Sequence, residues 1–492
     1  MILLGTNGHD SSCINLEKTG ISYLKLERYY QIKHFGQRYR GIADNKDFYL
    51  SIKDLSPDSF FRKFIPFKGN FFYLQIPHHL KHAYSIELFE SCDIHVVIDG
   101  QDGTSDPKWY SVYRGDTLIA SGSIKDCGGT LGHIWYKDIK GDSLDAPGKI
   151  MGLQSYGNFN ETYYEELKRW NCDYLGDYMN SSMFSALYAK NLSTESFERL
   201  HNQIKHIPYL YENKDLKGQS SLDYLHTLHR RAGEIVLEIF QRWVKPNEKV
   251  GYSGGVAQNV VWNTMLKQHY PNLTIYPHCG DEGLCLGVLH SLNKKYERSK
   301  LTVQNYPYCQ KDQAPDTTPS LDTIYKTAKF LAEGKIVAWY QGHGEIGPRA
   351  LGNRSILMDP RISNGKDIIN RVKNREYYRP FGSSVLSEYA KEYFGLDYEN
   401  PYMLYLGHTQ KDNLDAITHV DGTSRAQTVD SSCGYFRLLL EQFFELTGCP
   451  VLLNTSLNEA GKPIAGWIKN AETLFISTPI DILVVGDKIY VK

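Results

Sequence analysis

Short apolar stretches that end in polar, glycine-containing turns recur along the N-terminal part of the chain. "GISYLKLERYY" alternates between apolar and polar positions, which predicts a half-buried strand. "IHVVIDGQDG" (94–103) predicts a buried strand, and "WYSVYRGDTLIASGSI" predicts a hairpin that turns at Gly115 and Asp116. Strands that end in loops carrying Asp, Ser or Gly are typical of α/β domains that handle phosphates or metals.

A longer apolar period marks the middle of the chain. Residues 221–244 predict an amphipathic helix, and the buried face should carry Leu225, Leu228, Ala232, Val236, Ile239 and Phe240. This helix leads into "KVGYSGGVAQNVVWNTMLKQ", which predicts a strand, a glycine turn and a second helix. At the turn, the backbone N–H groups of Gly254 and Gly255 can cradle a phosphate, although most turns of this kind are structural.

Length and composition bound the class of protein. The 492 residues exceed what one hydrophobic core usually supports, so two or more domains are expected, with the polar stretch 300–320 as the predicted linker. A net charge of −1 argues against broad, charge-driven binding of nucleic acid. Nine scattered cysteines without a CxxC pair, and the lack of a signal peptide or membrane span, predict a cytoplasmic protein with reduced thiols.

The helix "LDTIYKTAKFLAEG" and the strand "KIVAWY" are predicted to open the second domain, before an unusual arginine loop. "GPRALGNRSILMDPR" (347–361) concentrates Arg349, Arg354 and Arg361 among glycines and prolines. One interpretation is a solvated turn, and the other is a grip on a planar anion. More groups suited to a phosphate or carboxylate follow: Lys373, Arg375, Arg379, Arg425, Asn454, Ser456 and Asn458. The chain has no GxxxxGK[ST] and no GxGxxG after a strand, which disfavours ordinary nucleotide-binding folds.

A second candidate site carries histidines. "HHLKHAYS" places His78 and His82 one helical turn apart, and Pro77 supplies a plausible helix start. Two imidazoles at this spacing form either half of a metal site or a surface histidine cluster. Asp281, in the glycine-flanked turn of "HCGDEGLCLGV", can supply the missing ligand or simply cap the following helix.

These motifs together resemble the NodU/CmcH family of O-carbamoyltransferases, which includes tobramycin carbamoyltransferase. The resemblance runs nearly end to end and is carried by "HDSS", "ERYYQIKHFG", "HHLKHAYS", "GKIMGLQSYG", "GGVAQN", "GDEGLCLG", "GEIGPRALGNRSILMDPR", "KNREYYRPF", "DGTSRAQTV" and "PVLLNTSLN". It implies an α/β fold with an actin/sugar-kinase-like (ASKHA, TsaD-like) N-terminal domain over 1–312, which holds the metal and transfers the carbamoyl group. It also implies a YrdC-like α/β domain over 320–492 that forms carbamoyl-adenylate, with the last strands as candidates to pack back on the first domain.

The resemblance also implies ligands for individual residues. His78, His82 and Asp281 match the metal ligands of the family, with iron expected and manganese or zinc as alternatives. The residues expected to bind carbamoyl phosphate are Arg349, Lys373, Arg375, Arg379, Arg425, Ser456 and Asn458. Those expected to bind the nucleotide, as Mg-ATP, are Gly254, Gly255, Asn259, Gly280, Arg354 and Asn454.

Catalytic roles follow from the same resemblance. His9, and Lys33 with His34, match positions near the transfer site. His229 stands where relatives place an acidic candidate base, and a half-buried structural histidine is the alternative. The family's "GEPIV" is "GKPIAG" here, so that Lys462 replaces a glutamate and removes a negative charge.

The expected activity is ATP-dependent O-carbamoyl transfer. Carbamoyl phosphate and ATP would give carbamoyl-adenylate, whose carbamoyl group passes to a hydroxyl of a secondary metabolite or of a hydroxymethylated pyrimidine in a nucleotide or DNA. The aromatic and basic stretch 60–73 is either a buried loop or a lid over the acceptor, and a homodimer is conceivable. Two other functions remain: a metal-dependent phosphotransferase of the actin/sugar-kinase superfamily, and a non-catalytic binding protein.

Overall fold

The chain forms an α/β protein, and its computed structural model describes residues 2–5, 12–17, 20–25, 27–28, 31, 76–99, 108–123, 146–168, 219–295, 303–459 and 461–492. Contacts between Cα atoms divide the chain into two compact units, which are described separately: Met1–Ser91 with Ile275–Lys492, and Cys92–Thr274. No described helix is both long enough and apolar enough to cross a membrane. The predicted TsaD-like and YrdC-like domains, with a boundary between 312 and 320, remain predictions.

The unit Cys92–Thr274 is built on a five-stranded sheet of order β6-β5-β4-β7-β8. Its strands are β4 (Ile94–Ile98), β5 (Lys108–Arg114), β6 (Thr117–Ser123), β7 (Val250–Ser253) and β8 (Leu273–Thr274). The predicted hairpin is confirmed, because β5 and β6 pair antiparallel on either side of Gly115, which has a φ of +54°. β4 and β7 pair in parallel, which brings the ends of two strands to one edge.

Helices account for the rest of this unit. They are α7 (Ala146–Leu153), η2 (Gln154–Tyr156), α8 (Glu161–Leu167), α12 (Gln219–Trp243), η4 (Gly255–Gln258) and α13 (Val260–His269). The predicted amphipathic helix is α12, and all six residues of its predicted apolar face are buried. The predicted strand, glycine turn and helix are β7, η4 and α13.

The other unit contains a small sheet formed by the first residues of the chain, together with two helices that pack against each other. The sheet is antiparallel and consists of β1 (Ile2–Gly5), β2 (Ser12–Glu17) and β3 (Gly20–Lys25). Helix α5 (His78–Glu87) starts after Pro77, as predicted, and packs against α14 (Leu284–Lys295), which follows the turn η5 (Asp281–Gly283). Gly287 makes this packing possible, because a Cβ there would lie 2.0 Å from the carbonyl oxygen of Lys81.

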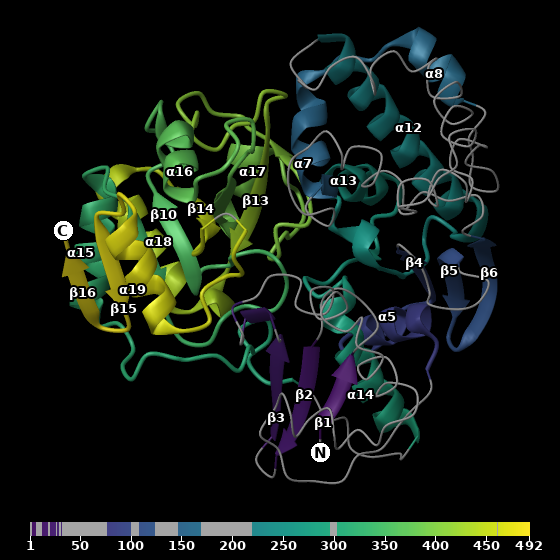
Figure 1. Cartoon of the computed structure of the whole chain (residues 1–492), viewed down its shortest axis with the longest axis horizontal. Helices are drawn as coiled ribbons and strands as arrows, with labels where there is room; N and C mark the ends of the chain where they lie inside the picture. Colours follow the sequence, from purple (N-terminus) through teal and green to yellow (C-terminus); the bar gives the residue numbers. More distant parts are fainter. Residues whose placement is uncertain are drawn as a thin grey trace, which may run out of the picture. The chain divides into compact units, whose positions relative to one another are not determined.

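The same unit contains an eight-stranded mixed sheet of order β12-β13-β11-β14-β10-β9-β15-β16 (Figure 1). Its strands are β9 (Val337–Tyr340), β10 (Arg354–Met358), β11 (Gly382–Leu386), β12 (Gly407–His408), β13 (Thr423–Val429), β14 (Val451–Ser456), β15 (Ile482–Val485) and β16 (Lys488–Val491). Its helices are α15 (Leu321–Ala332), α16 (Gly365–Lys373), η6 (Ser387–Tyr389), α17 (Ala390–Phe394), η7 (Ser431–Cys433), α18 (Tyr435–Thr447) and α19 (Ile468–Ser477). The core between sheet and helices is apolar, with Trp339, Phe436 and Leu452 essentially fully buried.

The last strands, β15 and β16, extend the eight-stranded sheet, since β15 pairs in parallel with β9 and antiparallel with β16. Their packing on the predicted first domain stays a prediction. The predicted linker is packed where it is described, from 303 onward. The backbone N–H of Lys311 donates to Tyr23 O at 2.6 Å, and that of Gln310 donates to Gly344 O at 3.1 Å. This stretch therefore connects β3 to the arginine loop.

The close approach of α5 and α14 gives a first prediction. Gly287→Ala should lower the free energy of unfolding by roughly 1–3 kcal/mol, because the new methyl group meets backbone that cannot rotate away. Gly148→Ala in α7 is the control, since a Cβ there meets nothing within 4 Å. Urea unfolding of both variants checks this. Equal stability of the two variants would contradict a tight α5–α14 contact.

Candidate functional site

The motif 347–361 is divided between a loop and a strand, because Arg354 begins β10. From here on, the arginine loop means residues 341–353, which join the neighbouring antiparallel strands β9 and β10. Its path is confined early on. Gly347 has a φ of +90°, and a Cβ there would lie 2.3 Å from Pro277 O. Only glycine fits this close approach of two backbones. The loop then presents Arg349, which is half-buried.

Arg349 lies in a cluster of four arginines that come from three parts of the chain. Arg375 and Arg379 follow the end of α16, and Arg425 lies on β13. Burial and the neighbouring Arg379 lower the pKa of Arg349 to about 10. Burial, and then Arg379, lower the pKa of Arg375 to about 9. The pKa of Arg425 is lowered well below its usual value by burial, then by Arg349, Arg375 and Arg379.

The cluster carries more positive charge than its protein neighbours neutralise. Glu376 lies 3.6 Å from Arg379, measured from carboxylate oxygen to guanidinium nitrogen. Among the described residues, the buried Nε atoms of Arg349 and Arg425 have no hydrogen-bond partner. Desolvated guanidinium groups with unused donors form a site for an anion. The structure thus favours the anion-binding interpretation of the arginine loop over the solvated turn.

Arg375 is held in place by its own contacts. Its Nε donates to Asn370 Oδ1 at 2.9 Å, and a terminal nitrogen donates to Pro380 O at 3.2 Å. The guanidinium carbon lies 4.2 Å from the ring centroid of Phe381. A guanidinium fixed on an aromatic face loses little further freedom when an anion binds.

Lys373 continues this polar site. The ammonium group, at the end of α16, donates to Ser456 Oγ at 3.1 Å and to Asn458 Oδ1 at 2.5 Å. The sheet register places β14, which ends at Ser456, across β11 from β13, because Gly382 of β11 pairs with Arg425 on one side and with Asn454 on the other. The seven residues predicted to bind carbamoyl phosphate thus form two groups, the four arginines and the hydrogen-bonded set of Lys373, Ser456 and Asn458, and their binding of one anion stays a prediction.

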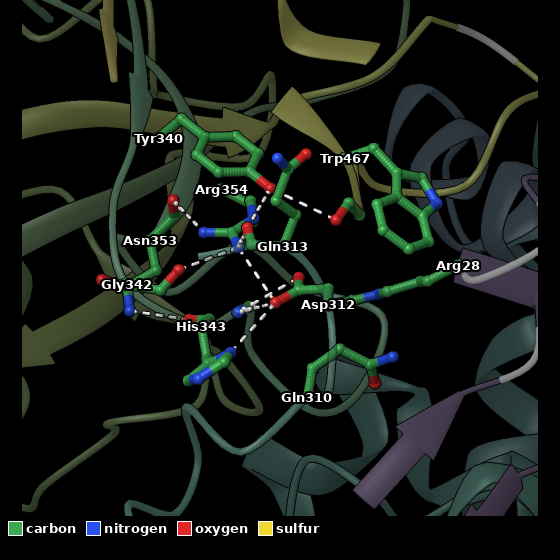
Figure 2. Close-up of polar contacts among 12 residues, drawn as sticks. Arg28, Gln310, Asp312, Gln313, Tyr340, Gly342, His343, Asn353, Arg354 and Trp467 are labelled. Carbon is green, nitrogen blue, oxygen red and sulfur yellow. Dashed lines mark hydrogen bonds and ion pairs between the residues drawn. The ribbon is translucent and has the colours of Figure 1, made fainter. Parts of the chain in front are cut away.

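The polar contacts of Arg354 are drawn in Figure 2. This arginine is fully buried and forms an ion pair with Asp312 at 3.0 Å. It also donates to the carbonyl oxygens of Gly342 at 3.0 Å and Gln313 at 3.1 Å, and its guanidinium carbon lies 3.7 Å from the ring centroid of Tyr340. These contacts tie the loop to residues 312–313, which is a structural role. Binding of a nucleotide by Arg354 stays a prediction.

Two other predicted residues are also engaged. Arg361 forms a forked ion pair with Asp359, with nitrogen–oxygen distances of 2.6 and 2.9 Å. Asn454 Nδ2 donates to Ser384 Oγ at 2.9 Å inside the sheet. Because Arg361 pairs with Asp359, two residues earlier in the chain, its contacts stabilise the local turn.

His78, His82 and Asp281 form the second site. The Nε2 atoms of the two histidines lie 3.3 Å apart, and each lies 3.4 Å from Asp281 Oδ1. All three side chains are buried, on α5 and η5. Donors held at about 2.0–2.1 Å from one ion lie roughly 3–3.4 Å from each other, so the spacing fits a shared metal. Two imidazoles and one carboxylate suit iron, zinc or manganese.

A third group of predicted residues lies in the unit Cys92–Thr274. Gly254 has a φ of +96°, and a Cβ there would lie 2.1 Å from Ile98 O. The backbone N–H of Gly255 donates to Asp99 Oδ1 at 3.2 Å. Asp99 was not among the candidate residues predicted from the sequence. Its position directly after the buried strand β4 could have indicated that its side chain meets the glycine turn. Gly280 of the predicted nucleotide set lies in the other unit, next to Asp281.

His229 contacts Asn259 rather than solvent. Asn259 Oδ1 accepts from the backbone N–H groups of Val261 and Trp262, so its Nδ2 must donate to His229 Nε2, at 3.0 Å. Burial, and then the neighbouring His226, lower the pKa of His229 to about 3. A neutral imidazole with its acceptor atom in use is a poor proton acceptor. The geometry favours the structural alternative for His229.

Several predicted positions lie outside the described residues. These are His9, Lys33, His34 and the stretch 60–73 with Arg62, Lys63 and Lys68. Their roles stay predictions.

Comparison with protein families gives two matches. The model for the carbamoyltransferase N-terminus matches residues 22–289, and the model for the carbamoyltransferase C-terminus matches residues 328–492.

Among curated proteins, the chain is similar to nodulation proteins of rhizobia. It is 31% identical to nodulation protein NolNO of Sinorhizobium fredii, over 70% of this chain and 52% of the relative. It is 33% identical to nodulation protein NolO of Bradyrhizobium diazoefficiens, over 69% of this chain and 64% of the relative. It is also 34% identical to the 3'-hydroxymethylcephem-O-carbamoyltransferase of Amycolatopsis lactamdurans, over 54% of this chain and 52% of the relative. The chain thus spans between half and two thirds of these relatives.

Among solved structures, component A of the (R)-2-hydroxyglutaryl-CoA dehydratase of Acidaminococcus fermentans aligns with 61% of this chain. The identity is 15% and the TM-score 0.33, which is too low to assign a fold.

The histidine and aspartate geometry gives the second prediction. His82→Ala and Asp281→Ala should each lose bound metal, because removal of one of three close donors leaves an incomplete site. Elemental analysis of the purified protein measures this, with His290→Ala on α14 as the control. Stoichiometric metal in the His78→Ala/His82→Ala double variant would refute the site.

The environment of His229 gives the third. With a pKa of about 3 in the folded chain and about 6.5 unfolded, His229 stays neutral in the fold while the unfolded chain takes up a proton below pH 6.5. Stability is therefore lost as pH falls. In His229→Gln, the loss of unfolding free energy between pH 7 and pH 5 should shrink by about 1–2 kcal/mol. Urea titrations measure it, with exposed His269→Gln as the control; identical pH slopes would contradict the burial of a neutral His229.

Proposed function

Because the chain belongs to the carbamoyltransferase family, we propose that it is an ATP-dependent O-carbamoyltransferase that acts on the hydroxyl group of a small molecule. One observation carries this proposal: four arginines converge with little carboxylate to neutralise them, beside an ammonium group held by Ser456 and Asn458. An acyl phosphate with two negative charges suits such a site.

We assign carbamoyl phosphate to the four-arginine cluster. An anion among Arg349, Arg375, Arg379 and Arg425 would relieve their mutual repulsion, and it would raise the arginine pKa values that burial and neighbouring charges now lower. Each charge-assisted hydrogen bond contributes about 1.5–3 kcal/mol. Several such bonds give binding and also hold the phosphate in one orientation.

The proposed first reaction forms carbamoyl-adenylate in two steps. Water cleaves the bond between the carbamoyl group and phosphate, which releases inorganic phosphate and leaves carbamate. A carbamate oxygen then attacks the α-phosphorus of ATP, and pyrophosphate departs, to give carbamoyl-adenylate. The residues of the cluster would hold the anions and stabilise the negative charge that develops on the departing groups.

The proposed second reaction uses the histidine and aspartate site. The acceptor hydroxyl attacks the carbamoyl carbon while its proton passes to a general base, and AMP leaves as the bond between the carbamoyl carbon and its phosphate oxygen breaks. His78, His82 and Asp281 would hold a metal ion, which when bound stabilises negative charge on the leaving phosphate. The side chains of α5 and η5 supply the ligands from a buried position and so limit access of water.

The fourth prediction separates the two reactions. Arg349→Ala and Lys373→Ala should each lower the carbamoyl-phosphate-dependent release of pyrophosphate from ATP by about ten- to a hundredfold, because the anion loses a charged partner. His82→Ala should spare pyrophosphate release and block carbamoyl transfer, followed by mass spectrometry of a panel of hydroxyl compounds.

Arg371→Ala is the matched control, since this exposed arginine of α16 lies two residues from Lys373. Release of ADP in place of pyrophosphate and AMP would identify a phosphotransferase instead. A defect of all three variants at the same step would contradict the assignment of two sites.

A further inference from the structure

Glu345 lies inside the arginine loop and is completely buried. Its Oε1 accepts hydrogen bonds from three backbone N–H groups of the same loop's returning half: Leu351 at 2.8 Å, Asn353 at 2.9 Å and Arg354 at 3.1 Å. One carboxylate oxygen thus links position 345 to residues 351–354, and Arg349 lies between these two points of the chain. Neither the family resemblance nor the motif assigned a role to this residue.

The outgoing half of the loop is held from the other side. Arg28, also buried, donates to the carbonyl oxygens of Glu345 and of Gly347, the latter at 2.7 Å. Asp312 accepts from the backbone N–H of Gly344 at 3.0 Å. The backbone of Glu345 is therefore fixed independently of its carboxylate, which is free to act on the returning half.

The residue after Arg349 is pinned through its carbonyl group. Asn454 Nδ2 donates to Ala350 O at 3.4 Å, and Gln427 Nε2 donates to Leu351 O at 2.9 Å. In the segment 350–354, Glu345 therefore binds backbone N–H groups, while Asn454 and Gln427 bind backbone carbonyl oxygens. Arg349 itself stands between the two fixed halves.

The cluster makes such fixation necessary. Without an anion, Arg349 is repelled by Arg379 and faces a cost of burial, and both effects favour its departure from the site. A loop of thirteen residues between two strands, 341–353, offers many conformations in which the arginine points elsewhere. A carboxylate with three hydrogen bonds to the loop opposes that departure without touching the anion.

We propose that Glu345 is a positioning residue that holds Arg349 in the four-arginine cluster and so preorganises the site for a phosphate-bearing substrate. This proposal rests on the assignment of carbamoyl phosphate to that cluster. The three hydrogen bonds of Glu345 Oε1 go to backbone groups, so its proposed effect reaches the anion through Arg349.

The test compares Glu345→Ala with Glu345→Gln. Glu345→Ala should raise the KM for carbamoyl phosphate by about tenfold or more and leave the KM for ATP unchanged, because Arg349 is lost from one anion. Glu345→Gln keeps an oxygen acceptor for the loop and should recover most of the affinity. Calorimetric titration with inorganic phosphate gives a second readout that does not require turnover.

Asp481→Ala is the matched control. Asp481 Oδ2 also accepts a backbone N–H, that of Ile336 at 2.8 Å, but at the opposite end of β9 from the arginine loop. This variant should lose stability without a change in either KM.

The outcomes separate the two proposals. If Arg349→Ala weakens phosphate binding and Glu345→Ala, still folded by circular dichroism, does not, then Glu345 holds no arginine and the inference is overturned. If Arg349→Ala also binds phosphate normally, the assignment of the cluster itself is wrong. Equal rises in both KM values in Glu345→Ala would show a general structural role and would overturn the inference as well. If Glu345→Ala does not fold, Glu345→Asp decides, because the shorter carboxylate cannot reach all three N–H groups: a rise in the KM for carbamoyl phosphate alone is expected, and an unchanged value would overturn the inference.

Discussion

Repulsion among four guanidinium groups is the constraint on which this structure depends. Desolvated like charges raise the free energy of the fold, and the lowered pKa values of Arg349 and Arg375 express that cost. A protein retains such an arrangement where a ligand removes the cost. A bound dianion, as proposed for carbamoyl phosphate, would offset this repulsion, so a cluster of this kind favours highly charged ligands over neutral ones.

The residues around the cluster are paired differently from the cluster itself. Arg28, Arg354 and Asp312 each form hydrogen bonds with backbone groups of residues 342–347, and Arg354 also pairs with Asp312. Arg354 thus has a carboxylate and backbone carbonyl oxygens as partners, whereas the four clustered arginines have little carboxylate near them and make a candidate binding site. The chain places both kinds in one stretch of sequence, and only the contacts distinguish Arg349 from Arg354.

This distinction marks how far the sequence could predict the molecule. Local patterns were sufficient for α12, for the hairpin at Gly115 and for the histidine pair on α5, because these features depend on neighbours in sequence. The residue pattern also singled out the arginines as candidates for an anion, and the family resemblance added which anion to expect. Neither could show that Arg354 is structural or that Glu345 closes the loop, because those contacts depend on how loop 341–353 packs. The pairing of 307–313 with β3 was equally invisible, since polar prolyl stretches usually connect domains rather than join sheets.

The two candidate sites are also linked through backbone contact. The arginine loop approaches the segment that carries Asp281: Gly347 lies too close to Pro277 O for any side chain, and the charge of Arg349 interacts with Cys279. Each of these residues is within four positions of a group proposed to act on the reaction. Because two backbones meet here without an intervening side chain, neither segment can shift far without displacing the other. The contact therefore ties the position of the arginine loop to that of the turn carrying Asp281, the candidate metal ligand.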